Sequence, residues 1–135
     1  MIGLVICTHS NLAEALLTSA EMIVGPIDQS QAVGVYPGDS PEEIHGRLES
    51  ALKSVDVGDG AIVLCDMFGG TPSNISLTFL SENIDVVTGV NLPMLLKFFT
   101  TRQGTVVDVS KAIQLHARDN ILAAGVLMGG SSEAG

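Results

Sequence analysis

Apolar stretches of strand length alternate along the chain with longer stretches whose apolar positions repeat at helical spacing. Strands are predicted at residues 2–7, 31–36, 60–65 and 84–90. Helices are predicted at residues 12–24, from residue 41 onward, at 71–82, at 91–102 and, last, up to residue 120. Strands that alternate with helices across short connections are typical of a mostly parallel sheet with helices on both faces. We therefore expect a doubly wound α/β fold.

Residues suited to helix ends mark where several of these helices begin. Ser40 with Glu43, and Asn11 with Glu14, each have the spacing of a capping box, in which side chains satisfy free N–H groups at a helix start. Thr71 directly precedes a proline, the residue preferred at the first helical position, so we expect Thr71 to cap the third helix.

The end of the chain fits more than one structure. Asp108 or Ser110 is expected to cap the last helix. Residues 121–128 are apolar and either extend that helix or form a strand. Residues 129–135 open with Gly-Gly-Ser-Ser, which predicts a flexible tail. Because no repeat or linker divides the chain, we expect a single domain at residues 1–128 followed by this tail.

Composition narrows the classes of function. Of the 135 residues 46% are hydrophobic and 16% charged, which indicates one packed core rather than disorder. The formal net charge of −9 argues against binding to nucleic acids or to anionic membranes. The chain starts without a basic leader, and its apolar runs are too short to span a bilayer. We therefore expect a cytoplasmic protein.

The two cysteines do not point to a metal or redox site. Cys7 and Cys65 both lie inside apolar runs, where cysteine usually serves as a small buried hydrophobe. No Cys or His spacing typical of metal ligands is present in the sequence. We expect no metal and no cofactor.

Two polar residues follow neighbouring strands of the predicted sheet. His9 comes directly after the first strand and Asp66 directly after the third. Sheets of this kind bind ligands beyond the carboxyl ends of their strands, where the strand order reverses. A carboxylate beside one imidazole nitrogen fixes the tautomer and leaves the other nitrogen free to accept a phosphoryl group. We predict that His9 and Asp66 form a catalytic pair; the alternatives are a merely solvated histidine and a carboxylate that only caps its loop.

Small and hydroxyl-bearing residues surround this predicted pair. Gly69 and Gly70 would let the backbone approach a ligand closely, and Ser10, Thr71 and Ser73 could donate to phosphate oxygens. We therefore predict that these five residues bind phosphate. The sequence lacks the lysine and the spacing of a nucleotide-binding phosphate loop, which disfavours a nucleotide-binding enzyme.

Three segments together resemble a known family. The segments are ICTHS at residues 6–10, DMFGGTPSN at 66–74 and GVNLPML at 89–95. In this order they resemble the IIA component of the mannose-type (mannose, fructose or sorbose) phosphoenolpyruvate-dependent sugar phosphotransferase system. The resemblance implies the strand order 2-1-3-4 and a homodimer that exchanges a further antiparallel strand. The segment at 121–128 is the candidate for that strand.

The same resemblance implies roles and partners. His9 would receive a phosphoryl group from the phosphocarrier HPr, with Asp66 as its partner, and pass it to a IIB component. Some relatives continue into a IIB domain, whereas this chain ends at Gly135. The acceptor is therefore expected to be a separate protein, or to be absent, in which case the protein would regulate rather than transport. The sequence does not identify the sugar.

Other functions fit parts of this pattern. A phosphotransfer subunit of a phosphoenolpyruvate-dependent dihydroxyacetone kinase shares the fold and the histidine, but the intact Gly-Gly-Thr-Pro segment favours the mannose type. A non-catalytic module that senses a small anion in the same crevice is a further alternative. His45 and His116 lie on predicted helices and are expected to be surface residues.

Overall fold

The computed structural model describes residues 1–133 and contains a four-stranded parallel sheet. The strands are β1 (Gly3–His9), β2 (Ser30–Val35), β3 (Ala61–Cys65) and β4 (Ile84–Thr88). Their order in the sheet is β2-β1-β3-β4, and each neighbouring pair is parallel. This confirms the expected α/β fold and its strand order.

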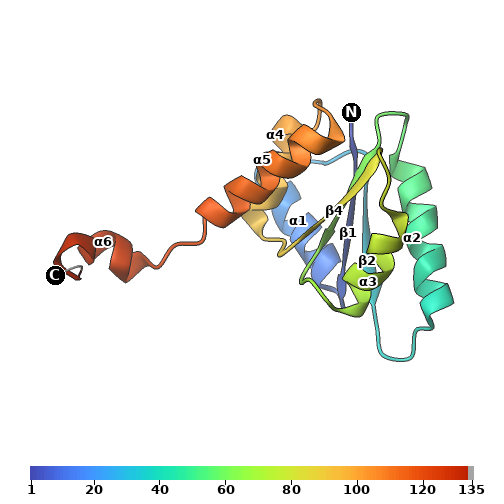
Figure 1. Ribbon diagram of the computed structural model, residues 1–135, viewed down its shortest axis with the longest axis horizontal. Helices are drawn as coiled ribbons and strands as arrows, with labels where there is room; N and C mark the ends of the chain where they lie inside the picture. The colour runs from blue at the N-terminus through green and yellow to red at the C-terminus, as the bar shows by residue number, and fades with distance from the viewer. Residues whose placement is uncertain (134–135) are drawn as a thin grey trace.

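Helices cover both faces of the sheet (Figure 1). One face carries α1 (Leu12–Val24), α4 (Leu92–Thr101) and α5 (Val106–Asp119). The other carries α2 (Pro41–Val55), the short α3 (Thr71–Ser76) and the single 3₁₀ turn η1 (Leu77–Phe79). Because successive side chains of a strand point to opposite faces, the central β1 is buried on both sides. That double burial explains its uninterrupted apolar sequence.

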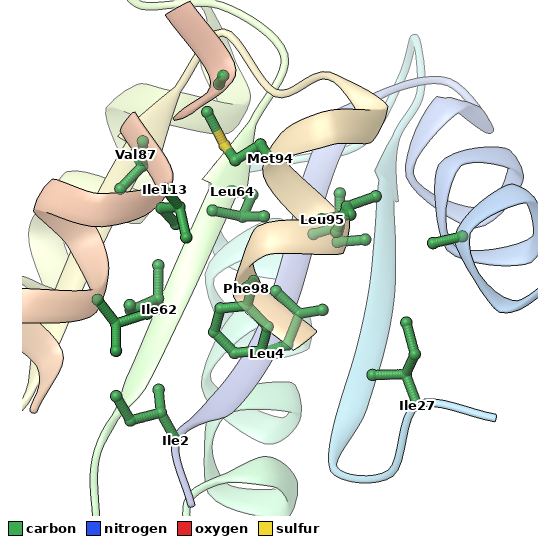
Figure 2. Close-up of a cluster of buried hydrophobic side chains, with 14 of the residues drawn as sticks. Ile2, Leu4, Ile27, Ile62, Leu64, Val87, Met94, Leu95, Phe98 and Ile113 are labelled. Atoms are coloured by element: carbon green, nitrogen blue, oxygen red, sulfur yellow. The ribbon is translucent and has the colours of Figure 1, made fainter. Parts of the chain in front are cut away.

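The larger core lies between the sheet and α4. Figure 2 shows Leu4 of β1 and Leu64 of β3 facing Leu95 and Phe98 of α4. All four side chains are fully buried. Burial of this area removes the apolar face of the sheet from water and fixes how the strands lie relative to the helices. The polar ends of β1 and β3 are thereby held in place.

The two predicted capping boxes have different outcomes. At α2 the box is confirmed: Ser40 Oγ accepts from the Glu43 N–H at 3.1 Å, and Glu43 Oε1 accepts from the Ser40 N–H at 3.0 Å. At α1 the box is wrong, because Asn11 makes no side-chain cap. The Thr8 hydroxyl instead accepts from the Ala13 N–H at 2.7 Å, from inside the sheet.

The boundaries of two further helices differ from expectation. Helix α3 starts with Thr71 inside it, preceded by Gly70, and ends at Ser76 rather than near residue 82. It stops early because the Ser81 N–H donates to the Ile84 carbonyl at 3.1 Å, which closes a turn into β4. Helix α5 is capped by Thr105, whose hydroxyl accepts from the Asp108 N–H at 3.2 Å, so Asp108 lies inside the helix.

The C-terminal segment forms a separate helix rather than the strand proposed for residues 121–128. Residues 121–123 have no regular secondary structure, and α6 (Ala124–Glu133) follows, lying apart from the body in Figure 1. A helix satisfies its backbone groups within the segment, as a lone strand cannot. The flexibility of residues 129–135 stays a prediction, and residues 134–135 lie outside the described part. Up to residue 133, no helix is long and apolar enough to cross a membrane.

Candidate functional site

His9 and Asp66 meet at the carboxyl edge of the sheet. β1 and β3 are neighbours with Cys7 level with Cys65, so the residues that follow these two cysteines lie side by side. His9 is the last residue of β1, and Asp66 directly follows β3. The His9 Nδ1 lies 2.8 Å from Asp66 Oδ2, and the backbone N–H of His9 donates to the same oxygen at 3.2 Å. The structure thus brings the predicted pair into direct contact.

This contact defines the chemistry of the imidazole. An ionised carboxylate only accepts hydrogen bonds, so Nδ1 carries the proton and donates it to Asp66. In the neutral imidazole the lone pair then lies on Nε2, on the other side of the ring. The His9 side chain is 49% exposed, whereas that of Asp66 is 16% exposed. The ring is therefore held at Nδ1 by a mostly buried carboxylate, and half of the His9 side chain is open to solvent.

The chain around His9 is held by backbone and hydroxyl contacts. The Thr8 hydroxyl donates to the His9 carbonyl at 3.1 Å, and the Ser10 N–H donates to the Val35 carbonyl at 2.8 Å. Ser10 has φ +55°, in the left-handed region, which turns the chain from β1 into α1. Its hydroxyl is exposed beside His9, where the phosphate-binding role predicted for it requires it to be.

The other predicted phosphate-binding residues lie in the glycine-rich loop after Asp66 and differ in how exposed they are. Gly70 lies against the His9 ring, and Thr71 is exposed at the start of α3. Within the described chain, no hydrogen bond occupies the N–H groups of Gly70 and Thr71. Ser73 differs, because it is fully buried and its hydroxyl is bonded to Gly69 and Gly70. The structure therefore does not present the Ser73 hydroxyl to a ligand.

Burial suppresses the acidity of the two cysteines beneath the site. Cys7 and Cys65 are fully buried on adjacent strands. Burial, joined by the proximity of Cys65, raises the pKa of the Cys7 thiol to about 12. Burial likewise raises the pKa of the Cys65 thiol to about 11. Neutral buried thiols are poor nucleophiles, so both serve as core residues, as the sequence predicted.

Sequence reasoning missed two features of this edge. One is Thr8, whose buried hydroxyl both caps α1 and holds the His9 carbonyl. The other is a set of exposed apolar side chains on segments that end or begin here: Leu12, Tyr36, Met67 and Phe68. Met67 and Phe68 stand in a loop beside a predicted catalytic residue, a signal that could have indicated a contact surface.

The site is not a deep pocket. Five cavities of about 280 to 520 Å³ are lined by residues other than His9 and Asp66. Among residues 1–133, no group of three His, Cys, Asp or Glu side chains could hold a metal ion. The His9 ring stands at the surface, because its side chain is 49% exposed.

Comparisons with known proteins agree with this geometry. The family described as "PTS system fructose IIA component" matches residues 3–114. The chain is 33% identical over 105 residues to the "PTS system fructose-specific EIIA component" of Bacillus subtilis (strain 168), a match covering 76% of this chain and 72% of that protein. It is also 33% identical over 103 residues to the "PTS system mannose-specific EIIAB component" of Escherichia coli (strain K12), covering 75% of this chain and 32% of that protein.

A solved structure extends the likeness to the fold. The crystal structure of phosphotransferase system component EIIA from Streptococcus agalactiae superposes with a TM-score of 0.83 at 25% identity. The superposition covers 93% of this chain and 99% of that one. The fold and a family match over most of the chain thus agree: this protein belongs to the fructose/mannose IIA family of the phosphotransferase system, whose members are phosphotransferase components of sugar uptake.

Proposed function

We propose that this protein is a cytoplasmic phosphocarrier that accepts a phosphoryl group from HPr on His9 and donates it to a IIB component. One observation carries the proposal. The 2.8 Å contact between His9 Nδ1 and Asp66 Oδ2 leaves Nε2 unprotonated on a half-exposed ring. A neutral nitrogen held in this way is a nucleophile near neutral pH, and it needs no metal or nucleotide.

The proposed transfer step involves one bond made and one broken. The Nε2 lone pair of His9 attacks phosphorus, an N–P bond forms, and the bond from phosphorus to the donor breaks with its electron pair leaving on the donor. The ring becomes cationic as this happens, and the Asp66 carboxylate at Nδ1 stabilises that charge. Transfer to a IIB component reverses these changes and returns the neutral imidazole.

The phosphoryl oxygens need donors, and the loop offers them. We assign this role to the free N–H groups of Gly70 and Thr71 and to the exposed hydroxyls of Ser10 and Thr71. The left-handed φ of +99° at Gly69 sets the turn that carries them. Ser73 contributes to the site by bonding the loop backbone and does not bind the phosphoryl group.

The surroundings of His9 favour proteins as donor and acceptor. Exposed apolar side chains stand at the same edge of the sheet, with Phe68 72% and Met67 52% exposed. Exposed apolar groups near a functional residue are typical of a protein contact surface. A small-molecule site would instead enclose most of its ligand.

We also propose that the protein is a homodimer that uses its C-terminal segment. Five large apolar side chains there are 62% to 86% exposed: Ile121, Leu122, Val126, Leu127 and Met128. A soluble chain rarely leaves so much apolar surface uncovered. A groove of about 280 Å³ beside the edge strand β4 offers a surface on the second copy. It is lined by Ser110 of α5, whose buried hydroxyl has no partner among residues 1–133.

Phosphoryl transfer with defined components tests the phosphocarrier proposal. The protein is incubated with phosphoenolpyruvate, enzyme I and HPr, and the product is analysed for an acid-labile, base-stable phosphoryl group. We expect one such group on the wild type and on His45→Ala, which removes an exposed histidine of α2, and none on His9→Ala. Labelling of His9→Ala, or labelling that requires only ATP, would contradict the proposal.

A further inference from the structure

We infer that Gly70 and Ser73 position the His9 imidazole: Gly70 by leaving room for the ring, and Ser73 by fixing the backbone of Gly70. The inference rests on the proposed phosphocarrier function, since it concerns how the same ring is held for transfer. Both residues act on His9 as positioning residues. Ser73 does not touch the phosphoryl group, and the positioning role of Gly70 is additional to the contact proposed for its N–H.

The space beside the His9 ring is too small for a side chain at position 70. A Cβ atom built on Gly70 would lie 2.8 Å from His9 Cε1 and 3.2 Å from His9 Nε2. Carbon atoms in normal contact are about 3.5–4.0 Å apart, so no other residue fits unless the ring moves. The ring thus occupies the space that a side chain at position 70 would need.

The ring is consequently restrained from two directions. Asp66 holds the Nδ1 side through a 2.8 Å hydrogen bond, and the Gly70 position borders the side that carries Cε1 and Nε2, where an added Cβ would collide with the ring. Since a displaced imidazole would lengthen the bond to Asp66, the position of Gly70 bears on the tautomer as well as on the direction of Nε2.

Ser73 fixes where the Gly70 backbone lies. Its hydroxyl accepts from the Gly69 N–H at 2.9 Å and donates to the Gly70 carbonyl at 3.1 Å. One buried hydroxyl therefore ties both glycines of the loop. Gly69 has φ +99°, and glycine adopts positive and negative φ values about equally. The backbone of Gly69 therefore does not by itself fix the shape of the loop, and the hydrogen bonds of Ser73 supply the restraint.

Burial distinguishes this role from phosphate binding. The Ser73 side chain is 0% exposed, and its hydroxyl uses its proton on Gly70 and a lone pair on Gly69. A phosphoryl group on the exposed Nε2 has no open path to it. The effect of Ser73 on transfer must pass through the backbone of Gly70.

Two variants with matched controls test the inference. Gly70→Ala adds a methyl group against the ring, and Gly46→Ala adds one in α2 where nothing lies within 4 Å. Ser73→Ala removes the hydroxyl that ties the loop. Ser76→Ala removes another fully buried hydroxyl of α3, one that bonds the Pro72 carbonyl at 2.6 Å and leaves the glycines untouched.

The measurements separate positioning from direct contact. Long-range proton–nitrogen spectra of the unphosphorylated imidazole report the tautomer, and the His9 signal is assigned by its loss in His9→Ala. We expect the Nδ1–H tautomer in the wild type and both controls, and a mixture of tautomers in Gly70→Ala and Ser73→Ala. Transfer from saturating phospho-HPr should fall on the order of 10- to 100-fold in these two variants, with little change in KM.

Each other outcome is informative. A normal tautomer and normal rate in Gly70→Ala and Ser73→Ala would overturn the inference. A slower rate with a normal tautomer would also overturn it, because the glycine loop would then act on the phosphoryl group alone and not on the ring. An altered tautomer in a protein whose wild type accepts no phosphoryl group would support positioning while rejecting the proposed function.

Discussion

Asp66 is the residue on which the state of the His9 ring depends. A single oxygen of its carboxylate accepts from both the ring Nδ1 and the backbone N–H of His9. Its other oxygen is buried and has no partner among the described residues. A buried oxygen without a partner costs stability, which favours the role proposed for Asp66 at the ring over a role as a loop cap.

Replacing this carboxylate tests its role at constant shape. Asp66→Asn keeps an acceptor near Nδ1 but removes the negative charge that offsets the cationic ring. We expect phosphorylation of His9 to slow on the order of 10- to 100-fold with the fold retained. Rapid-quench kinetics measure the rate, and circular dichroism verifies the fold. A rate equal to the wild type would reduce Asp66 to a loop cap.

The two cysteines give a prediction that depends on pH. Burial raises the thiol pKa values to about 12 for Cys7 and about 11 for Cys65, from an ordinary value of 9.0. The folded state therefore keeps protons that the unfolded chain loses above pH 9, so this contribution is intact below pH 9 and is lost as pH rises. We expect no alkylation of native protein at pH 8 and a falling free energy of unfolding above pH 9. Rapid native labelling would show that the strands open.

At this scale the sequence predicted the residues whose position follows from topology. His9 and Asp66 could be placed because residues that follow adjacent parallel strands must meet at one edge. Thr8 and Ser73 could not be assigned, because the direction of a hydroxyl depends on which groups the folded chain brings within reach. The hydroxyl of Ser73 and its place after the two glycines predicted phosphate binding, but only the structure shows that this hydroxyl is buried.

Among the elements, α4 is tied to the start of the sheet by one side chain. Arg102, which follows α4, is 3% exposed and lies over the Phe98 ring. Its guanidinium donates to the carbonyls of Ile2 at 2.8 and 3.0 Å, of Asp28 at 2.7 Å and of Gln29 at 3.2 Å. Burial lowers its pKa, and the carbonyls take up its donors.

Loss of this side chain should destabilise the whole domain. Arg102→Met removes the guanidinium donor from the carbonyls of Ile2 and Asp28, while the Gln29 carbonyl keeps the Leu4 N–H. We expect a loss of about 3 kcal/mol in the free energy of unfolding. Arg118→Met is the matched control, because Arg118 is 71% exposed and should change stability by less than about 0.5 kcal/mol. Urea denaturation measures both. Equal stability of the two variants would contradict this role for Arg102.

Element boundaries show where local sequence signals fail. The Ser40 and Glu43 box worked because both partners are local and the helix start is exposed. The Asn11 and Glu14 box has the same spacing, yet the hydrogen bond to the Ala13 N–H is made by the Thr8 hydroxyl, at the end of β1, and not by Asn11. Helix α3 ends before residue 82, the predicted end, because Ser81 takes part in the turn into β4. In both cases a tertiary contact overrode a local preference.

For the whole molecule, the exposed apolar C-terminal segment is the feature a single chain leaves unexplained. Residues 121–133 lie apart from the body (Figure 1). Removing residues 121–135 should therefore leave the secondary structure of the remaining chain nearly unchanged. If the segment joins two copies, sedimentation equilibrium will show a dimer for the full chain and a monomer for the shortened one.

A point substitution controls for the loss of backbone in that experiment. Leu127→Asp retains the segment but places a charge on its apolar surface, where Leu127 is 62% exposed. We expect this variant to be a monomer as well. A full chain and shortened chain of the same oligomeric state, or a shortened chain that does not fold, would contradict the proposed contact between copies.

The central claim is that the fold presents Nε2 of His9, with Nδ1 protonated and held by Asp66. The most direct test records the imidazole nitrogens of His9 by NMR before and after phosphoryl transfer from HPr. We expect a protonated Nδ1 throughout and a phosphorus–nitrogen coupling that appears only at Nε2. A phosphoryl group on Nδ1, or none on His9 at all, would contradict it.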